Sequence, residues 1–135
     1  MFKQLLLTIT ASFLLIGGAS AQTSADGSEA IKSATMAQVH ELAESMVKQV
    51  NASAPINVDA ITSVTGATYT RSNNTFLYRV KLATNIRSDE FFQTQQKRLC
   101  AGKIVVAMME RTVQFVYSVT TPQYGYTVAY NYFHC

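Results

Sequence analysis

The spacing of the two cysteines constrains the fold of this chain more than any other feature. Cys100 and Cys135 enclose half of the aromatic residues, and Cys135 is the last residue of the sequence. Two cysteines in an exported chain most simply form one disulfide, although a metal pair or a reactive thiol are alternatives. The spacing is far from a Cys-x-x-Cys motif. The sequence therefore predicts a structural disulfide that closes a loop of about 35 residues and contributes about 3–4 kcal/mol.

The first 21 residues predict export. Lys3 precedes an apolar run over residues 5–16, and Ala19-Ser-Ala21 forms a small-residue cleavage site. This order is typical of a secretory signal peptide, and the apolar run is short for a membrane span. We expect cleavage after Ala21, a periplasmic or secreted location and no membrane span in the mature chain; a retained anchor is the alternative. The residue directly after the expected cleavage site is Gln22 and not the cysteine that a bacterial lipoprotein would need as its lipid acceptor.

The rest of the chain is one domain in size. Residues 22–30 are mostly small and polar and predict a disordered leader, whereas residues 31–135 carry enough apolar residues for a single core. The formal charge of +3 includes Lys3 of the signal peptide. Such a small surplus does not indicate nucleic acid as a partner.

Hydrophobic periodicity predicts two helices and two hairpins. Apolar residues recur at helical spacing over residues 36–50 and again after Ser88, which suits an N-cap. A short helical turn is expected over residues 104–109. Strand patterns cover residues 56–70, with Gly66 as a bulge or bend, and residues 75–83, 112–121 and 126–134.

This order predicts an α+β fold. We expect a four-stranded antiparallel sheet made of two hairpins, with the N-terminal helix and the central helix packed against one face and one disulfide. On the strand over residues 75–83, Phe76, Tyr78, Val80 and Leu82 should face the core.

The sequence contains no recognisable catalytic motif, and we expect neither a cofactor nor a metal. His40 lies on the first helix without a second histidine at i+4, and His134 precedes a cysteine that we expect to be oxidised. No Gly-x-Ser-x-Gly motif or phosphate-binding glycine-rich loop is present. A non-enzymatic protein is therefore favoured, and a small hydrolase that uses His40 or His134 is an alternative.

Three tyrosines form the candidate surface of the last predicted strand. Tyr126, Tyr130 and Tyr132 share one face by alternation. Tyrosines offer a large amphipathic contact area, which suits a protein-binding face. The other interpretation, which we favour, is core and cross-strand packing.

The order of elements, the strand Leu77-Tyr-Arg-Val-Lys-Leu82, the cysteine at a helix end and the closing aromatic hairpin that stops at Cys135 resemble a known group. They are similar, over about residues 58–135, to small Gram-negative periplasmic proteins with a cystatin-like layout, which include the sheet-bearing pilotins of type II secretion. Pilotins are lipoproteins, and this chain lacks the lipidation cysteine; no functional residue is carried over from them.

The expected function is that of an exported, non-enzymatic protein. It would bind another periplasmic or envelope protein, or assist envelope or secretion assembly. An immunity or inhibitor protein directed against a toxin or hydrolase is the alternative from another class. The sequence makes no prediction of the oligomeric state.

Overall fold

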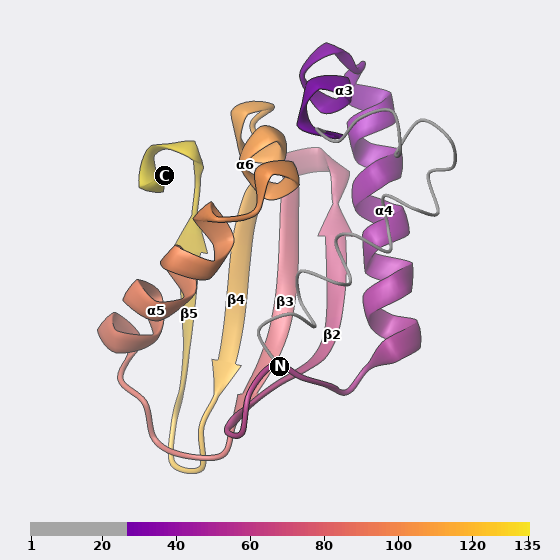
Figure 1. Cartoon of the computed structure of the whole chain (residues 1–135). Helices are drawn as coiled ribbons and strands as arrows, with labels where there is room; N and C mark the ends of the chain where they lie inside the picture. Colours follow the sequence, from indigo (N-terminus) through magenta and orange to yellow (C-terminus); the bar gives the residue numbers. More distant parts are fainter. Residues whose placement is uncertain (1–26) are drawn as a thin grey trace.

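The computed structural model describes residues 27–135 (Figure 1). The predicted signal peptide and residues 22–26 of the predicted leader lie outside this range. Four α-helices are present in it: α3 (Gly27–Ser33), α4 (Met36–Ser53), α5 (Ser88–Cys100) and α6 (Lys103–Glu110). The strands are β1 (Ile56–Asn57), β2 (Thr62–Thr70), β3 (Thr75–Leu82), β4 (Gln114–Thr120) and β5 (Gly125–Tyr130). Two short 3-10 helices, η1 (Arg71–Asn73) and η2 (Tyr132–His134), follow β2 and β5.

The α+β class is confirmed, but the sheet differs from the prediction. It is a mixed sheet of five strands in the order β1-β2-β3-β4-β5, not an antiparallel sheet of four. The pairs β2–β3 and β4–β5 are antiparallel, whereas β3 and β4 are parallel. The reason is the connection through α5 and α6, which returns the chain to the end of the sheet where β3 began. Alternation within a strand carries no information about the direction of its neighbour.

The fifth strand comes from a segment that was predicted to be continuous with β2. Ile56 and Asn57 instead fold back to pair with Val64 and Ser63 of β2. The intervening turn is fixed locally, because the Asp59 carboxylate accepts a hydrogen bond from the backbone amide of Ile61 at 2.9 Å. An aspartate that bonds to the backbone two residues on stabilises a turn. Composition alone did not distinguish this short hairpin from one long strand.

The helix α3 was also not predicted. Its residues 27–30 belong to the segment expected to be disordered, yet Gly27 and Ser28 are buried. The guanidinium of Arg111, which follows α6, donates hydrogen bonds to the carbonyls of Ile31 at 2.7 Å and Ala34 at 2.6 Å. A partner far along the chain therefore holds this short helix, which its own composition did not indicate.

The core lies between the sheet and the helices. Helices α4, α5 and α6 cover one face of the sheet, with α4 beside β2 and α5 beside β5 (Figure 1). The predicted faces of β3 are confirmed: its even-numbered residues from Phe76 to Leu82 are buried, and Arg79 and Lys81 point to solvent. Phe76 stacks on Phe115 of β4 with ring centroids 5.3 Å apart. This layered arrangement leaves the opposite face of the sheet without a helix among residues 27–135.

Candidate functional site: the C-terminal aromatic corner

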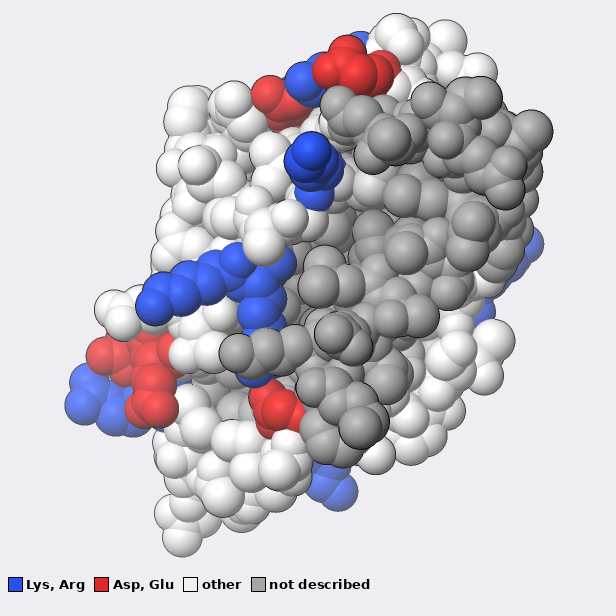
Figure 2. Space-filling model, viewed as in Figure 1, with Lys and Arg blue, Asp and Glu red and all other residues white. Residues whose placement is uncertain are grey.

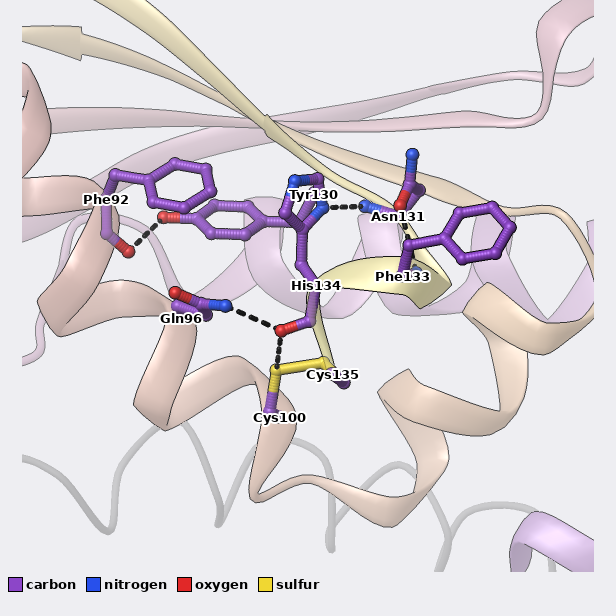
Figure 3. The surroundings of a disulfide bond; sticks show 8 residues. All are labelled: Phe92, Gln96, Cys100, Tyr130, Asn131, Phe133, His134 and Cys135. Atoms are coloured by element: carbon purple, nitrogen blue, oxygen red, sulfur yellow. Dashed lines mark hydrogen bonds between the residues drawn. A yellow bond between two sulfur atoms is a disulfide. The ribbon is translucent and has the colours of Figure 1, made fainter.

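The predicted disulfide is present and forms the base of the candidate site. Cys100 is the last residue of α5, and Cys135 directly follows η2; their Cα atoms are 5.4 Å apart. This distance lies in the ordinary range for a disulfide. Figure 3 shows that the bond ties η2 to the end of the helix. We call residues 131–135, with the disulfide that holds them to α5, the C-terminal corner.

Local hydrogen bonds fix the backbone of this corner (Figure 3). The side-chain oxygen of Asn131 accepts a hydrogen bond from the amide of Phe133 at 3.0 Å, and the amide of Asn131 donates to Nδ1 of His134 at 2.9 Å. The side-chain amide of Gln96, on α5, donates through Nε2 to the backbone carbonyl oxygen of His134 at 2.6 Å. These bonds form a cap at the start of η2 and a second link to α5, so the corner has a defined conformation.

Aromatic side chains of α5 and β5 pack against the corner. The ring of Phe92 on α5 stacks on Tyr130 of β5 with centroids 4.5 Å apart. The hydroxyl of Tyr130 donates to the carbonyl oxygen of Phe92 at 2.8 Å. Burial raises the pKa of Tyr130 well above its ordinary value, which favours the protonated hydroxyl that donates this hydrogen bond. The ring of His134 contacts both aromatic rings edge-on.

The corner presents apolar surface to solvent. Phe133 is 91% exposed and Tyr132 is 44% exposed. An isolated exposed apolar residue is ordinary, but a phenylalanine held outward by a capped turn and a disulfide is preorganised. An exposed aromatic ring on a fixed backbone has the shape and polarity to fill an apolar pocket.

The structure does not bring the three predicted tyrosines together on one surface. Tyr130 is fully buried. Tyr126 is half-buried, and its hydroxyl donates to the carbonyl oxygen of Ile86 at 2.7 Å. Tyr132 lies beyond the end of β5, where the alternation of the strand no longer applies. Sequence reasoning missed Phe133 because it extended the strand through residue 134; Asn131, a good capping residue, was the signal that the strand ends there.

The two histidines belong to separate hydrogen-bonded clusters. His134 is part of the corner, whereas Nε2 of His40 lies 2.9 Å from the side-chain oxygen of Asn74. Asn74 in turn donates to the hydroxyl of Thr112 at 3.0 Å. This second cluster links α4 to the turns that precede β3 and β4, which is a structural role. Residues 27–135 contain no group of three or more His, Cys, Asp or Glu side chains arranged to hold a metal ion.

Charged side chains of both signs occur on the described surface, and several of them form ion pairs. Where described residues are visible on the face that carries the helices, acidic and basic side chains lie close together (Figure 2). Among residues 27–135, Arg71 is paired with Glu44 at 2.7 Å. None of the helices within residues 27–135 is long and apolar enough to cross a membrane.

The described residues thus define a small α+β protein in which helices cover one face of a mixed sheet and a disulfide fixes the C-terminus. No family model and no curated protein sequence matches the chain. Among solved structures, it is similar to the type II secretion pilotin AspS of Vibrio cholerae, with 15% identity, a TM-score of 0.62, and coverage of 81% of this chain and 100% of that chain.

Two further structures share the fold. The pilotin EpsS of the Vibrio vulnificus type 2 secretion system has 13% identity and a TM-score of 0.61, covering 74% of this chain and 94% of that chain. A Pseudomonas aeruginosa protein thought to be secreted has 15% identity and a TM-score of 0.60, covering 73% and 93%. The fold resemblance to pilotins that was predicted from the sequence is therefore confirmed.

Proposed function

We propose that this chain is an exported, non-enzymatic protein that binds another protein of the cell envelope through the C-terminal corner and assists the assembly of a secretion or envelope complex. The observation that carries the proposal is Phe133, which is 91% exposed although its backbone is fixed on both sides. Full burial of a phenylalanine contributes about 1.5–3 kcal/mol. Because η2 is already ordered, little conformational entropy is lost on binding.

Location and fold support the same proposal. Cleavage after Ala21 would release the mature chain into an oxidising compartment, where a disulfide persists. Two of the solved structures with this fold are named as pilotins of type II secretion. A role for this chain beside a secretion complex would be of the same kind, with the fold supplying the scaffold and the corner supplying the contact.

The test is capture of the partner in cells. A tagged chain with its own signal peptide is crosslinked in the envelope, and the captured protein is identified by mass spectrometry. Phe133→Ala should reduce capture at least tenfold, because the anchor is lost. The matched control is Tyr124→Ala, since Tyr124 is 41% exposed but lies at the far end of the β4–β5 hairpin. Equal capture by wild type and Phe133→Ala would reject the corner as the contact surface.

A further inference from the structure

The outer edge of β5 carries backbone groups that have no partner within residues 27–135. In the β4–β5 hairpin, the amide of Thr121 donates to the carbonyl oxygen of Tyr124 at 2.7 Å, and the register then pairs Val119 with Tyr126. Hydrogen-bonded pairs alternate with non-bonded pairs along an antiparallel ladder. The even-numbered residues of β5 therefore bond to β4, and the backbone groups of Gly125, Thr127 and Ala129 point outward.

The other neighbour of β4 supports this assignment independently. The amide of Gln114 donates to the carbonyl oxygen of Asn74, at the start of β3, at 2.8 Å. The even-numbered residues of β4 therefore point toward β3, and its odd-numbered residues point toward β5. This is the alternation that the turn at Thr121 requires.

The two edges of the sheet differ in how far their backbone groups are protected from pairing with another strand. At the β2 edge, β1 pairs with Ser63 and Val64, a bulge follows between Val64 and Gly66, and the side chain of Asn51 bonds to both backbone groups of Ala67. Strand edges are ordinarily protected by such bulges, short strands, charges or covering elements. The six residues of β5 contain no charge, no proline and no bulge, and Thr127 is exposed.

We propose that β5 pairs with β5 of a second copy of this chain, antiparallel and centred on Thr127, to form a continuous ten-stranded sheet. In this register Thr127 lies opposite Thr127 of the second copy, and Gly125 lies opposite Ala129. Three outward residues on each copy then form six backbone hydrogen bonds. The facing side chains are small or hydroxylated, and paired threonines across strands are favourable.

Charge favours the edge as the contact between copies. The edge brings no like charges together, because β5 carries none. The open face of the sheet presents Arg79 and Lys81 of β3, which the register places beside Ser118 and Thr120 of β4. Stacking two such faces would bring like charges together, which is unfavourable. The edge therefore fits a second copy better than the face does.

Sedimentation of the purified mature chain tests the dimer. Wild type should sediment at twice the monomer mass as concentration rises. Thr127→Pro removes an outward N–H without removing a bond to β4, so it should weaken dimerisation at least tenfold. Thr127→Val keeps the N–H and is the matched control. A wild type that stays monomeric at all concentrations overturns the proposal.

The register has its own test, which does not depend on how well the proline variant folds. Opposed residues of a hydrogen-bonded antiparallel pair have Cα atoms about 5.5 Å apart, which suits a disulfide. Thr127→Cys should give a covalent dimer under mild oxidation. Thr68→Cys, exposed on β2, should not. Equal crosslinking of the two variants overturns the proposed register. Capture of an envelope partner through Phe133 is measured separately, so either proposal can fail alone.

Discussion

The side chain of Asn51, near the end of α4, forms two hydrogen bonds with the backbone of Ala67 at the outer edge of β2. Its Nδ2 donates to the carbonyl oxygen of Ala67 at 3.0 Å, and its Oδ1 accepts from the amide of Ala67 at 2.8 Å. Ala67 is completely buried. Because buried backbone groups must be paired, this one side chain acts as a neighbouring strand would and joins α4 to the sheet.

Replacing Asn51 should be costly. Asn51→Ala leaves a buried donor and a buried acceptor unpaired, and each costs about 1–3 kcal/mol. We expect the free energy of unfolding to fall by about 2–4 kcal/mol, measured by urea denaturation monitored by circular dichroism. Asn51→Asp keeps an acceptor for the amide but loses the donor. An alanine variant as stable as wild type would contradict the role given to Asn51.

The disulfide should contribute a large share of the stability. The loop between Cys100 and Cys135 spans 35 positions, for which loop closure is worth about 3–4 kcal/mol. The double variant Cys100→Ser/Cys135→Ser should lose about that amount in urea unfolding. Intact mass after alkylation without reductant should show no modified cysteine in wild type. A doubly alkylated chain would show that the bond does not form.

Acid should weaken the link between the β1–β2 turn and α5. Arg98 contacts Asp59 at 3.0 Å, and the two side chains are 22% and 29% exposed. Burial alone would raise the pKa of Asp59, but hydrogen bonds from the Ile61 amide and the Arg98 guanidinium lower it below 3.8. A carboxylate with a depressed pKa stabilises the fold above its unfolded pKa, and this contribution is lost as pH falls through the folded pKa.

The comparison with Asp59→Asn isolates this effect. The asparagine keeps an acceptor for Ile61 but carries no charge. We expect wild type to be more stable by about 1 kcal/mol at neutral pH, a value that allows for partial exposure. The difference should stay constant down to about pH 5 and shrink below about pH 4. A difference that grows on acidification would contradict the assignment.

How far the sequence predicts this fold depends on the range of the interaction. Periodicity located α4, α5 and the core face of β3, because those patterns are properties of neighbouring residues. The parallel contact between Phe76 and Phe115 was not predicted. It depends on the route of the chain through α5 and α6, and no local pattern records that route. The hydrogen bonds from Arg111 to α3 were missed for the same reason.

The candidate site was also predicted only in part. The disulfide followed from cysteine number and export. The exposure of Phe133 did not, because one residue decides whether β5 continues or ends. Asn131 ends the strand by capping η2. The aromatic residues after it therefore no longer alternate between the two faces of the sheet. Tyr132 and Phe133 therefore lie outside the pattern that was applied to them.

Arg111 should control the attachment of α3. Its Nη1 donates to the carbonyl oxygens of Ile31, Lys32 and Ala34 at 2.7, 3.2 and 2.6 Å. The carbonyls of Ile31 and Lys32 lie in the last turn of a seven-residue helix, and that of Ala34 directly follows it. Carbonyl groups at this end of a helix lack helical partners, and a positive charge is favourable there. A helix this short is not stable alone. Arg111→Ala should therefore release α3 while the sheet stays folded.

Hydrogen exchange measures this release. In Arg111→Ala, the amides of residues 30–34 should exchange at least tenfold faster than in wild type, which corresponds to about 1.4 kcal/mol of lost local stability. Amides of β3 and β4 should keep their protection. Arg87→Ala, which removes an exposed ion pair with Asp89 at 3.1 Å, should leave α3 unchanged. If exchange in α3 were the same in all three proteins, packing against α6 alone would hold the helix, and the hydrogen bonds from Arg111 would be dispensable.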